Sequence, residues 1–146
     1  MHPSWGPYPD TVLHFPTASV RIDLRVPLDS AARQALAGLG LGHPFGVVTA
    51  SNPLGISLDN AANLRLGRVL AGVVRTWYPG AIPADGESPD RTHREPGFAL
   101  PLPPDETRNL AARFFQKALF WYDGERFFIM PVLARGEALP LPPAAC

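Results

Sequence analysis

Two asparagines are the first residues whose types and spacing suggest a site. Asn52 stands before Pro53 at the end of the apolar run 45–50, and Asn63 lies in the helix expected next. On a helix with about 100° per residue, Asn63 falls at the edge of the apolar stripe, so its half-buried amide needs hydrogen-bond partners. An asparagine before a proline commonly turns the chain and caps a helix. The pair therefore predicts either a buried structural network of amides or a polar pocket.

A histidine and a glutamate form the second candidate pair. His93 and Glu95 are two residues apart, so an extended strand would place both side chains on one face. This arrangement is compatible with a general acid/base pair or with two metal ligands. A solvated loop is the alternative, and a third ligand is not evident, because the nearby acids fall in an expected flexible tip. The sequence therefore predicts neither a metal site nor a cofactor.

Other patterns that carry chemistry are not found. The chain has no phosphate-binding loop, H-E-x-x-H, G-x-S-x-G or EF-hand pattern, and the glycines of 38–42 follow a helix instead of opening one. Cys146 is the single cysteine, which excludes a disulfide within the chain. No apolar run reaches the ~18 residues that span a bilayer, and the N-terminus does not resemble a signal peptide. A cytoplasmic protein without a membrane segment is expected.

The charge balance limits the possible partners. Lys and Arg together number 13 among 146 residues, and Asp and Glu together also number 13. Without an excess of positive charge, a dedicated nucleic-acid-binding protein is not expected. A local site for single-stranded nucleic acid is left as an alternative, formed by exposed aromatic side chains together with Arg65, Arg68, Arg91 and Arg94.

The prolines suggest how the chain is divided. The sequence holds 18 prolines, which cluster at both ends and in one internal loop. They predict a proline-rich N-terminal arm over 1–17, a single domain over 18–134 and a proline-rich C-terminal tail over 135–146. Trp5 and Tyr8 in the arm are expected to lie against the body of the domain.

Hydrophobic periodicity predicts the elements that position the candidate residues. Residues 20–26 alternate between apolar and charged side chains, as in a strand with one wet face. Residues 45–50 are apolar on both faces, which predicts an interior strand. Helices are expected over 30–39, capped by Asp29 or Ser30, over 58–74, capped by Ser57, and from about 105 to 116. Residues 75–78 are expected to form a short strand.

The second half of the chain completes the predicted fold. Residues 79–97 are expected to form a long loop with a mobile tip at 84–90, and a strand over 98–102 is interrupted by Pro101 or lies at a sheet edge. Residues 118–122 and 126–130 form a hairpin around Asp123 and Gly124. The order β-α-β-α-β-β-α-β-β predicts a single α+β domain, with a mainly antiparallel sheet and about three helices on one face.

Four short motifs occur in order between residues 49 and 118. They are Thr49-Ala-Ser-Asn-Pro53, Asn63, Glu95-Pro-Gly-Phe98 and Phe114-Phe-Gln-Lys-Ala118. Because the four motifs occur in this order, the chain resembles a small bacterial family of unknown function, over about residues 20–130. The resemblance implies a related fold but no activity, and it adds Thr49, Glu95 and Gln116 to the two asparagines as candidate ligand-binding residues.

Two functions fit these observations. The first is a non-catalytic intracellular module that binds a small ligand or a partner protein. Some of Phe115, Tyr122 and Phe127 are expected to be exposed near the hairpin, where they would suit self-association or a protein partner. The alternative is an enzyme that uses Glu95, with or without His93, as acid or base in an amide-lined pocket. The enzyme requires these side chains to surround an accessible cavity.

Overall fold

The computed structural model describes residues 5–143, so Cys146 lies outside the described residues. Within this range the chain forms three α-helices and ten strands. The helices are α1 (Ser30–Gly38), α2 (Asn60–Trp77) and α3 (Pro104–Arg113), with 3-10 turns at Tyr8–Asp10 and Pro53–Gly55. The strands are β1 (Val12–Phe15), β2 (Val20–Asp23), β3 (Phe45–Thr49), β4 (Ile82–Pro83), β5 (Asp85–Glu87), β6 (Arg94–Glu95), β7 (Gly97–Leu100), β8 (Ala118–Tyr122), β9 (Phe127–Pro131) and β10 (Leu139–Leu141).

The strands form two antiparallel sheets. The smaller sheet has the order β2-β1-β5-β6, and the larger has the order β10-β9-β8-β3-β7-β4. Strand β3 pairs with β7 on one side and β8 on the other, so the predicted interior strand is confirmed. Its two neighbours use its backbone N–H and C=O groups, and both of its faces are buried.

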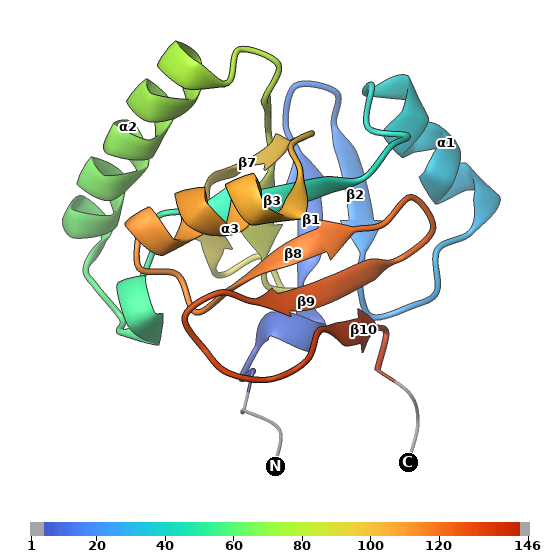
Figure 1. Ribbon diagram of the computed structural model, residues 1–146. Coiled ribbons are helices and arrows are strands. Elements are labelled where there is room, and N and C mark those ends of the chain that lie inside the picture. Colours follow the sequence, from blue (N-terminus) through green and yellow to red (C-terminus); the bar gives the residue numbers. More distant parts are fainter. Residues whose placement is uncertain (1–4, 144–146) are drawn as a thin grey trace.

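Both faces of the larger sheet are covered. Helices α2 and α3 pack on one face, and α3 lies across β3 in Figure 1. The smaller sheet and α1 cover the other face, where the core includes Leu13, Ile22 and Leu36. The predicted α+β class and element order are confirmed, but α1 does not share a face with α2 and α3. The reason is that strands with two apolar faces require a cover on each side.

The helix boundaries follow from their N-terminal caps. The side chain of Asp29 accepts a hydrogen bond from the backbone N–H of Ala32 at 2.8 Å, as expected for the cap of α1. Asp59, and not the predicted Ser57, caps α2 by accepting from Ala62 N at 2.7 Å. Helix α2 then continues through residues 75–77, so the predicted strand over 75–78 is wrong, and β4 takes its place in the order.

The predicted long loop is also wrong, because residues 79–97 contain β4, β5 and β6. Strand β5 pairs with β1, which lies in the segment expected to be an irregular arm. Ala84, Asp85 and Glu87 are consequently buried instead of forming a mobile tip. Strand β10 likewise falls in the proline-rich tail and pairs with β9. These pairings join segments that are distant in sequence, so local composition gives no sign of them.

The aromatic side chains are more buried than expected. Trp5 is buried and the Tyr8 ring packs 5.6 Å from the Phe120 ring, which confirms that the arm lies on the body. Tyr122 and Phe127 are also buried, because layers cover both faces of the β8–β9 hairpin. The exposed aromatic surface predicted for the hairpin is therefore absent from the described residues, although Phe115 just before it is 58% exposed.

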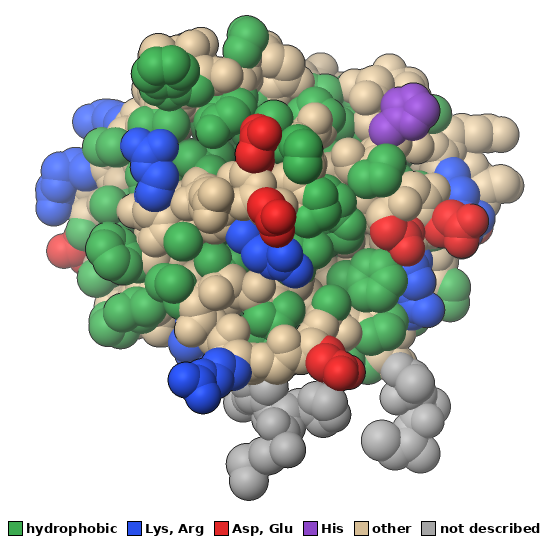
Figure 2. Space-filling view, in the orientation of Figure 1, with side chains coloured by type: hydrophobic (Ala, Val, Ile, Leu, Met, Phe, Trp, Pro, Cys, Tyr) green, Lys and Arg blue, Asp and Glu red, His purple; other side chains and the backbone are tan. Residues whose placement is uncertain are grey.

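The surface of the described residues carries mixed charge. On the face that displays α2, α3, β8 and β9, acidic and basic side chains are scattered among hydrophobic ones (Figure 2). In the described part of the chain, no helix combines the length and the apolar character needed to cross a membrane.

Helix α3 packs closely against β3 at Gly46. A Cβ atom at this glycine would collide with the Cγ2 methyl of Thr107, a residue that is fully buried. We expect Gly46→Ala to lower the free energy of unfolding by ~1–3 kcal/mol through overpacking. Urea denaturation measures this loss.

A second substitution tests the cause of that loss. Thr107→Ser removes the methyl group but keeps the hydroxyl that donates to Pro103 O at 3.0 Å. In a double-mutant cycle, Thr107→Ser should recover part of the stability lost in Gly46→Ala. Additive losses would contradict a direct collision between the two side chains.

Candidate functional site

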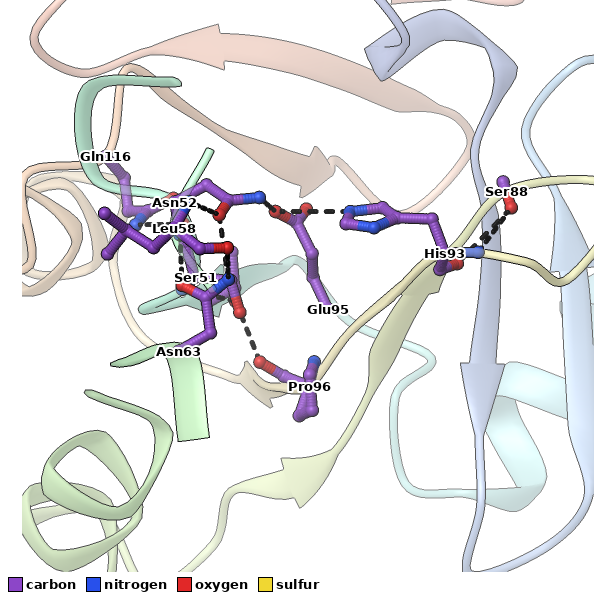
Figure 3. Close-up of polar contacts among 10 residues, drawn as sticks. Ser51, Asn52, Leu58, Asn63, Ser88, His93, Glu95, Pro96 and Gln116 are labelled. Atoms are coloured by element: carbon purple, nitrogen blue, oxygen red, sulfur yellow. Dashed lines mark hydrogen bonds and ion pairs between the residues drawn. The ribbon is translucent and has the colours of Figure 1, made fainter. Parts of the chain in front are cut away.

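Asn52 is the centre of a hydrogen-bond network at the end of β3. Its backbone N–H donates to Asn63 Oδ1 at 2.9 Å, and its Oδ1 accepts from Asn63 Nδ2 at 2.8 Å and from Leu58 N at 3.0 Å. Its Nδ2 donates to Glu95 Oε1 at 3.2 Å (Figure 3). Asn52 therefore contacts both Asn63 and Glu95, as predicted, and these hydrogen bonds connect the end of β3 to α2 and β6.

The backbone of Asn52 is left-handed, with φ 48° and ψ 62°. Asparagine tolerates this conformation better than most residues do. Leu54 and Phe115 also have positive φ, at 55° and 56°, and Leu54 N donates to Phe115 O at 2.7 Å. Such residues cost free energy and tend to gather at functional sites. The sharp turn after β3 thus concentrates backbone strain beside the network.

Thr49 has a structural role in this arrangement. Its hydroxyl donates to Pro96 O at 2.8 Å and accepts from Ser51 N at 3.1 Å. These bonds attach the last residue of β3 to the segment after β6. Thr49 lines neither of the two clefts described below, so of the five candidate ligand-binding residues it is the one placed away from them.

Gln116 lies beyond α3, where its amide orientation is determined by two backbone carbonyls. Its Nε2 donates to Ser51 O at 3.1 Å and to Phe114 O at 3.2 Å. Because both partners are acceptors, the amide nitrogen must face them and the oxygen must face away. Gln116 is only 3% exposed, yet Oε1 accepts no hydrogen bond from the described residues. The side chain lines a cleft, which leaves this acceptor available to a ligand.

Two clefts lie on either side of Asn52. The larger, about 610 Å³, lies between α2 and the strands β4 to β7, and Asn52 and Asn63 both line it. The smaller, about 320 Å³, is lined by Asn52, Glu95 and Gln116 together with Tyr8 and Phe120. His93 and Ser57 line both clefts. Four of the five candidate ligand-binding residues therefore reach an accessible cavity.

Glu95 is a partly buried carboxyl group at the smaller cleft. Its side chain is 31% exposed, and Oε1 lies 3.7 Å from His93 Nε2, so the predicted proximity of these two residues is confirmed (Figure 3). Burial raises the pKa of Glu95, although the charge of His93 and the hydrogen bond from Asn52 oppose the shift. The ionised form of Glu95 therefore lowers the stability of the folded protein relative to the neutral form.

Tyr8 is a site residue that the sequence did not indicate. Burial raises the pKa of its hydroxyl to about 12, and the negative charge of Glu95 adds to the shift. The hydroxyl therefore stays protonated over the physiological range. Tyr8 was assigned to the proline-rich arm, and only the packing of that arm on Phe120 brings it to the cleft.

The smaller cleft has a second acid, Glu87, beside Glu95. The sequence did not indicate Glu87 as a site residue. Its carboxylate accepts from Arg21 Nη1 at 2.9 Å, and His14 Nδ1 lies 2.9 Å from the other oxygen without hydrogen-bond alignment. Burial would raise the pKa of Glu87, but the hydrogen bond and charge of Arg21 and the charge of His14 outweigh it and lower the pKa. Glu87 is thus a paired carboxylate, unlike Glu95.

The comparisons with known proteins agree with the resemblance seen in the sequence. Residues 48–119 match a family described as "Protein of unknown function (DUF3293)". This segment is therefore similar to that family. It includes Thr49, Asn52, Asn63, Glu95 and Gln116, and it is shorter than the expected range of about 20–130. No curated protein and no solved structure matches the chain.

Metal ligands are not grouped in the part of the chain that the structure describes. No three His, Cys, Asp or Glu side chains within residues 5–143 come together in a suitable arrangement. Asp85, which faces the larger cleft, instead lies 3.3 Å from Arg94 Nη1.

The amide network predicts a measurable loss when Asn63 is truncated. Asn63→Ala leaves the N–H of Asn52 without its acceptor and removes one of the two donors to Asn52 Oδ1, so we expect the free energy of unfolding to fall by ~1–3 kcal/mol. Asn60→Ala, at the exposed first residue of the same helix, is the matched control, and it should change stability by less than ~0.5 kcal/mol. Equal stabilities of the two variants in urea would contradict the network.

The raised pKa of Glu95 predicts a pH-dependent effect of Glu95→Gln. In the unfolded chain Glu95 ionises near its ordinary value of 4.5, and in the folded protein it ionises at higher pH. The folded state therefore binds more protons in this interval, and the contribution of Glu95 to stability falls as pH rises through it. Glu95→Gln removes the charge, so it should be more stable than the wild type above this interval, and the advantage should disappear as pH falls through the interval to 4.5. Urea denaturation across the pH range tests this, and a variant less stable at neutral pH would contradict it.

Proposed function

We propose that the chain is a non-catalytic module that binds a small ligand in the smaller cleft beside Asn52. The observation that carries the proposal is the oxygen of Gln116. This oxygen accepts no hydrogen bond from the described residues, and it is not among their fully buried, unpartnered side-chain atoms, so it is open to a molecule in the cleft. A ligand with a hydrogen-bond donor would satisfy it.

The carboxyl group of Glu95 supports the same proposal. A purely structural network would need only an acceptor for Asn52 Nδ2, and a neutral glutamine side chain could supply it without the cost of burying a charge. The chain instead has an acid with a raised pKa that faces a cavity. Groups that lower stability in this way are typical of sites retained for binding or catalysis.

An enzyme is the second candidate, and the contact between Glu95 and His93 favours it. The two side chains lie 3.7 Å apart at the opening of the clefts, where one can hold a proton that the other releases. The raised pKa of Glu95 brings the group nearer to neutrality, which suits a general acid or base. Asn52 and Gln116 would then position the substrate.

Some sequence-based expectations stay predictions. These are the bacterial origin, the cytoplasmic location and the binding of a partner protein. Self-association also stays a prediction; of the three aromatic side chains expected near the hairpin, Phe115 is exposed, whereas Tyr122 and Phe127 are buried.

A thermal-shift screen tests the binding proposal without presuming a reaction. Purified protein is mixed with a panel of acidic, basic and neutral metabolites, and at least one should raise the melting temperature in a saturable way. Ser57 is exposed, makes no side-chain hydrogen bond to the described residues and lines both clefts, so Ser57→Trp should abolish the shift.

Ser30→Trp is the matched control, because Ser30 is exposed on α1 and lines neither cleft. A ligand whose effect survives Ser57→Trp would place its site elsewhere, and a panel without any saturable effect would count against the module. If a panel member is instead converted to product and Glu95→Gln abolishes the conversion, the enzyme replaces the module as the function.

A further inference from the structure

The two clefts differ in the charges that line them. The larger cleft has Arg68 and Arg94 opposite the single acid Asp85. The smaller cleft has two carboxyl groups, Glu87 and Glu95, and within the described residues neither Lys nor Arg lines it. The side chain of Lys117 lies against Gly55, but Lys117 is not among the described residues that line the cleft. The smaller cleft is therefore the one whose lining favours a positive charge.

The two carboxyl groups of this cleft are not equally satisfied. Glu87 has the guanidinium of Arg21 at 2.9 Å. Among the described residues, Glu95 has the neutral amide of Asn52 and the imidazole of His93 as its polar partners, and both contacts are made to Oε1. Oε2 of Glu95 accepts no hydrogen bond within the described part of the chain. This second oxygen is the acceptor for which the fold provides no cationic partner.

A second free acceptor faces the same cleft from a different element. Gln116 Oε1 is directed away from the two carbonyls that hold Nε2, and Gln116 is 3% exposed. One charged and one neutral acceptor together favour N–H donors that carry a positive charge. The rings of Tyr8 and Phe120, 5.6 Å apart, provide an apolar wall for the carbon skeleton of the ligand.

We propose that the smaller cleft recognises a primary ammonium group, which donates hydrogen bonds to Glu95 Oε2 and Gln116 Oε1. The inference rests on the proposed binding function and specifies the class of its ligand. An ammonium group is compact and has three donors that can turn toward acceptors on separate elements. Here the acceptors come from β6 and from the segment after α3. A quaternary ammonium has the charge but no N–H donor, so it is excluded as the preferred ligand.

A set of matched small probes tests the charge and the donors separately. The probes are n-butylamine, 1-butanol, butyrate and tetramethylammonium chloride at neutral pH, with binding followed by amide chemical shifts of residues around the cleft. The amine should bind saturably, and the other three should bind at least tenfold more weakly or not at all. Glu95→Gln should weaken amine binding by tenfold or more, because it removes the charge and keeps the shape of the side chain.

Glu106→Gln provides the matched control, since Glu106 is an exposed acid of α3 that lines neither cleft. It should bind the amine like the wild type. Equal binding of butanol or butyrate, or undiminished amine binding by Glu95→Gln, would overturn the ammonium assignment. If amines fail while a metabolite of another class binds in a manner blocked by Ser57→Trp, the ammonium assignment fails and the binding module stands. If neither amines nor metabolites bind, both fail.

Discussion

The left-handed turn at Asn52 is the constraint on which the site depends. It lets one side chain contact Asn63 of α2, the backbone of Leu58 just before that helix, and Glu95 of β6, while the backbone N–H of Asn52 donates to Asn63 as well. A residue with a longer side chain or a β-branched one would not combine this backbone conformation with these four contacts. The turn therefore sets where α2 begins relative to β3, and with it the wall that separates the two clefts.

Satisfied and unsatisfied polar groups stand side by side in this region. Asn52 and Asn63 use their amides on each other, which accounts for them as structural residues. Glu95 and Gln116 each retain an oxygen that the described residues leave without a donor, and both line the smaller cleft. The network thus holds the framework rigid while two acceptors remain for a ligand. This division allows the proposed binding site to share residues with a structural network.

Close packing behind the site restrains the framework. Gly46 admits the buried Thr107 of α3 against β3, and Gly97 of β7 lies so near Val48 O that a Cβ atom would be 2.5 Å from it. Neither position can accept a side chain without displacing a neighbour. The strand that delivers Asn52 is consequently held on both its helix-facing side and its paired edge, so the polar turn at its end is placed on a rigid element.

The sequence by itself determined the features that depend on neighbouring residues. The apolar run of β3, the cap of α1 at Asp29, the β8–β9 hairpin and the half-buried position of Asn63 all follow from local periodicity and local hydrogen bonds. The family motifs added Glu95 and Gln116. Only the tertiary structure decided that β1 pairs with β5, which buries Glu87 and carries Tyr8 to the cleft, and that the free oxygen of Gln116 faces it. The reason is physical: pairing between distant strands is selected by the complementarity of whole surfaces, which no local pattern encodes.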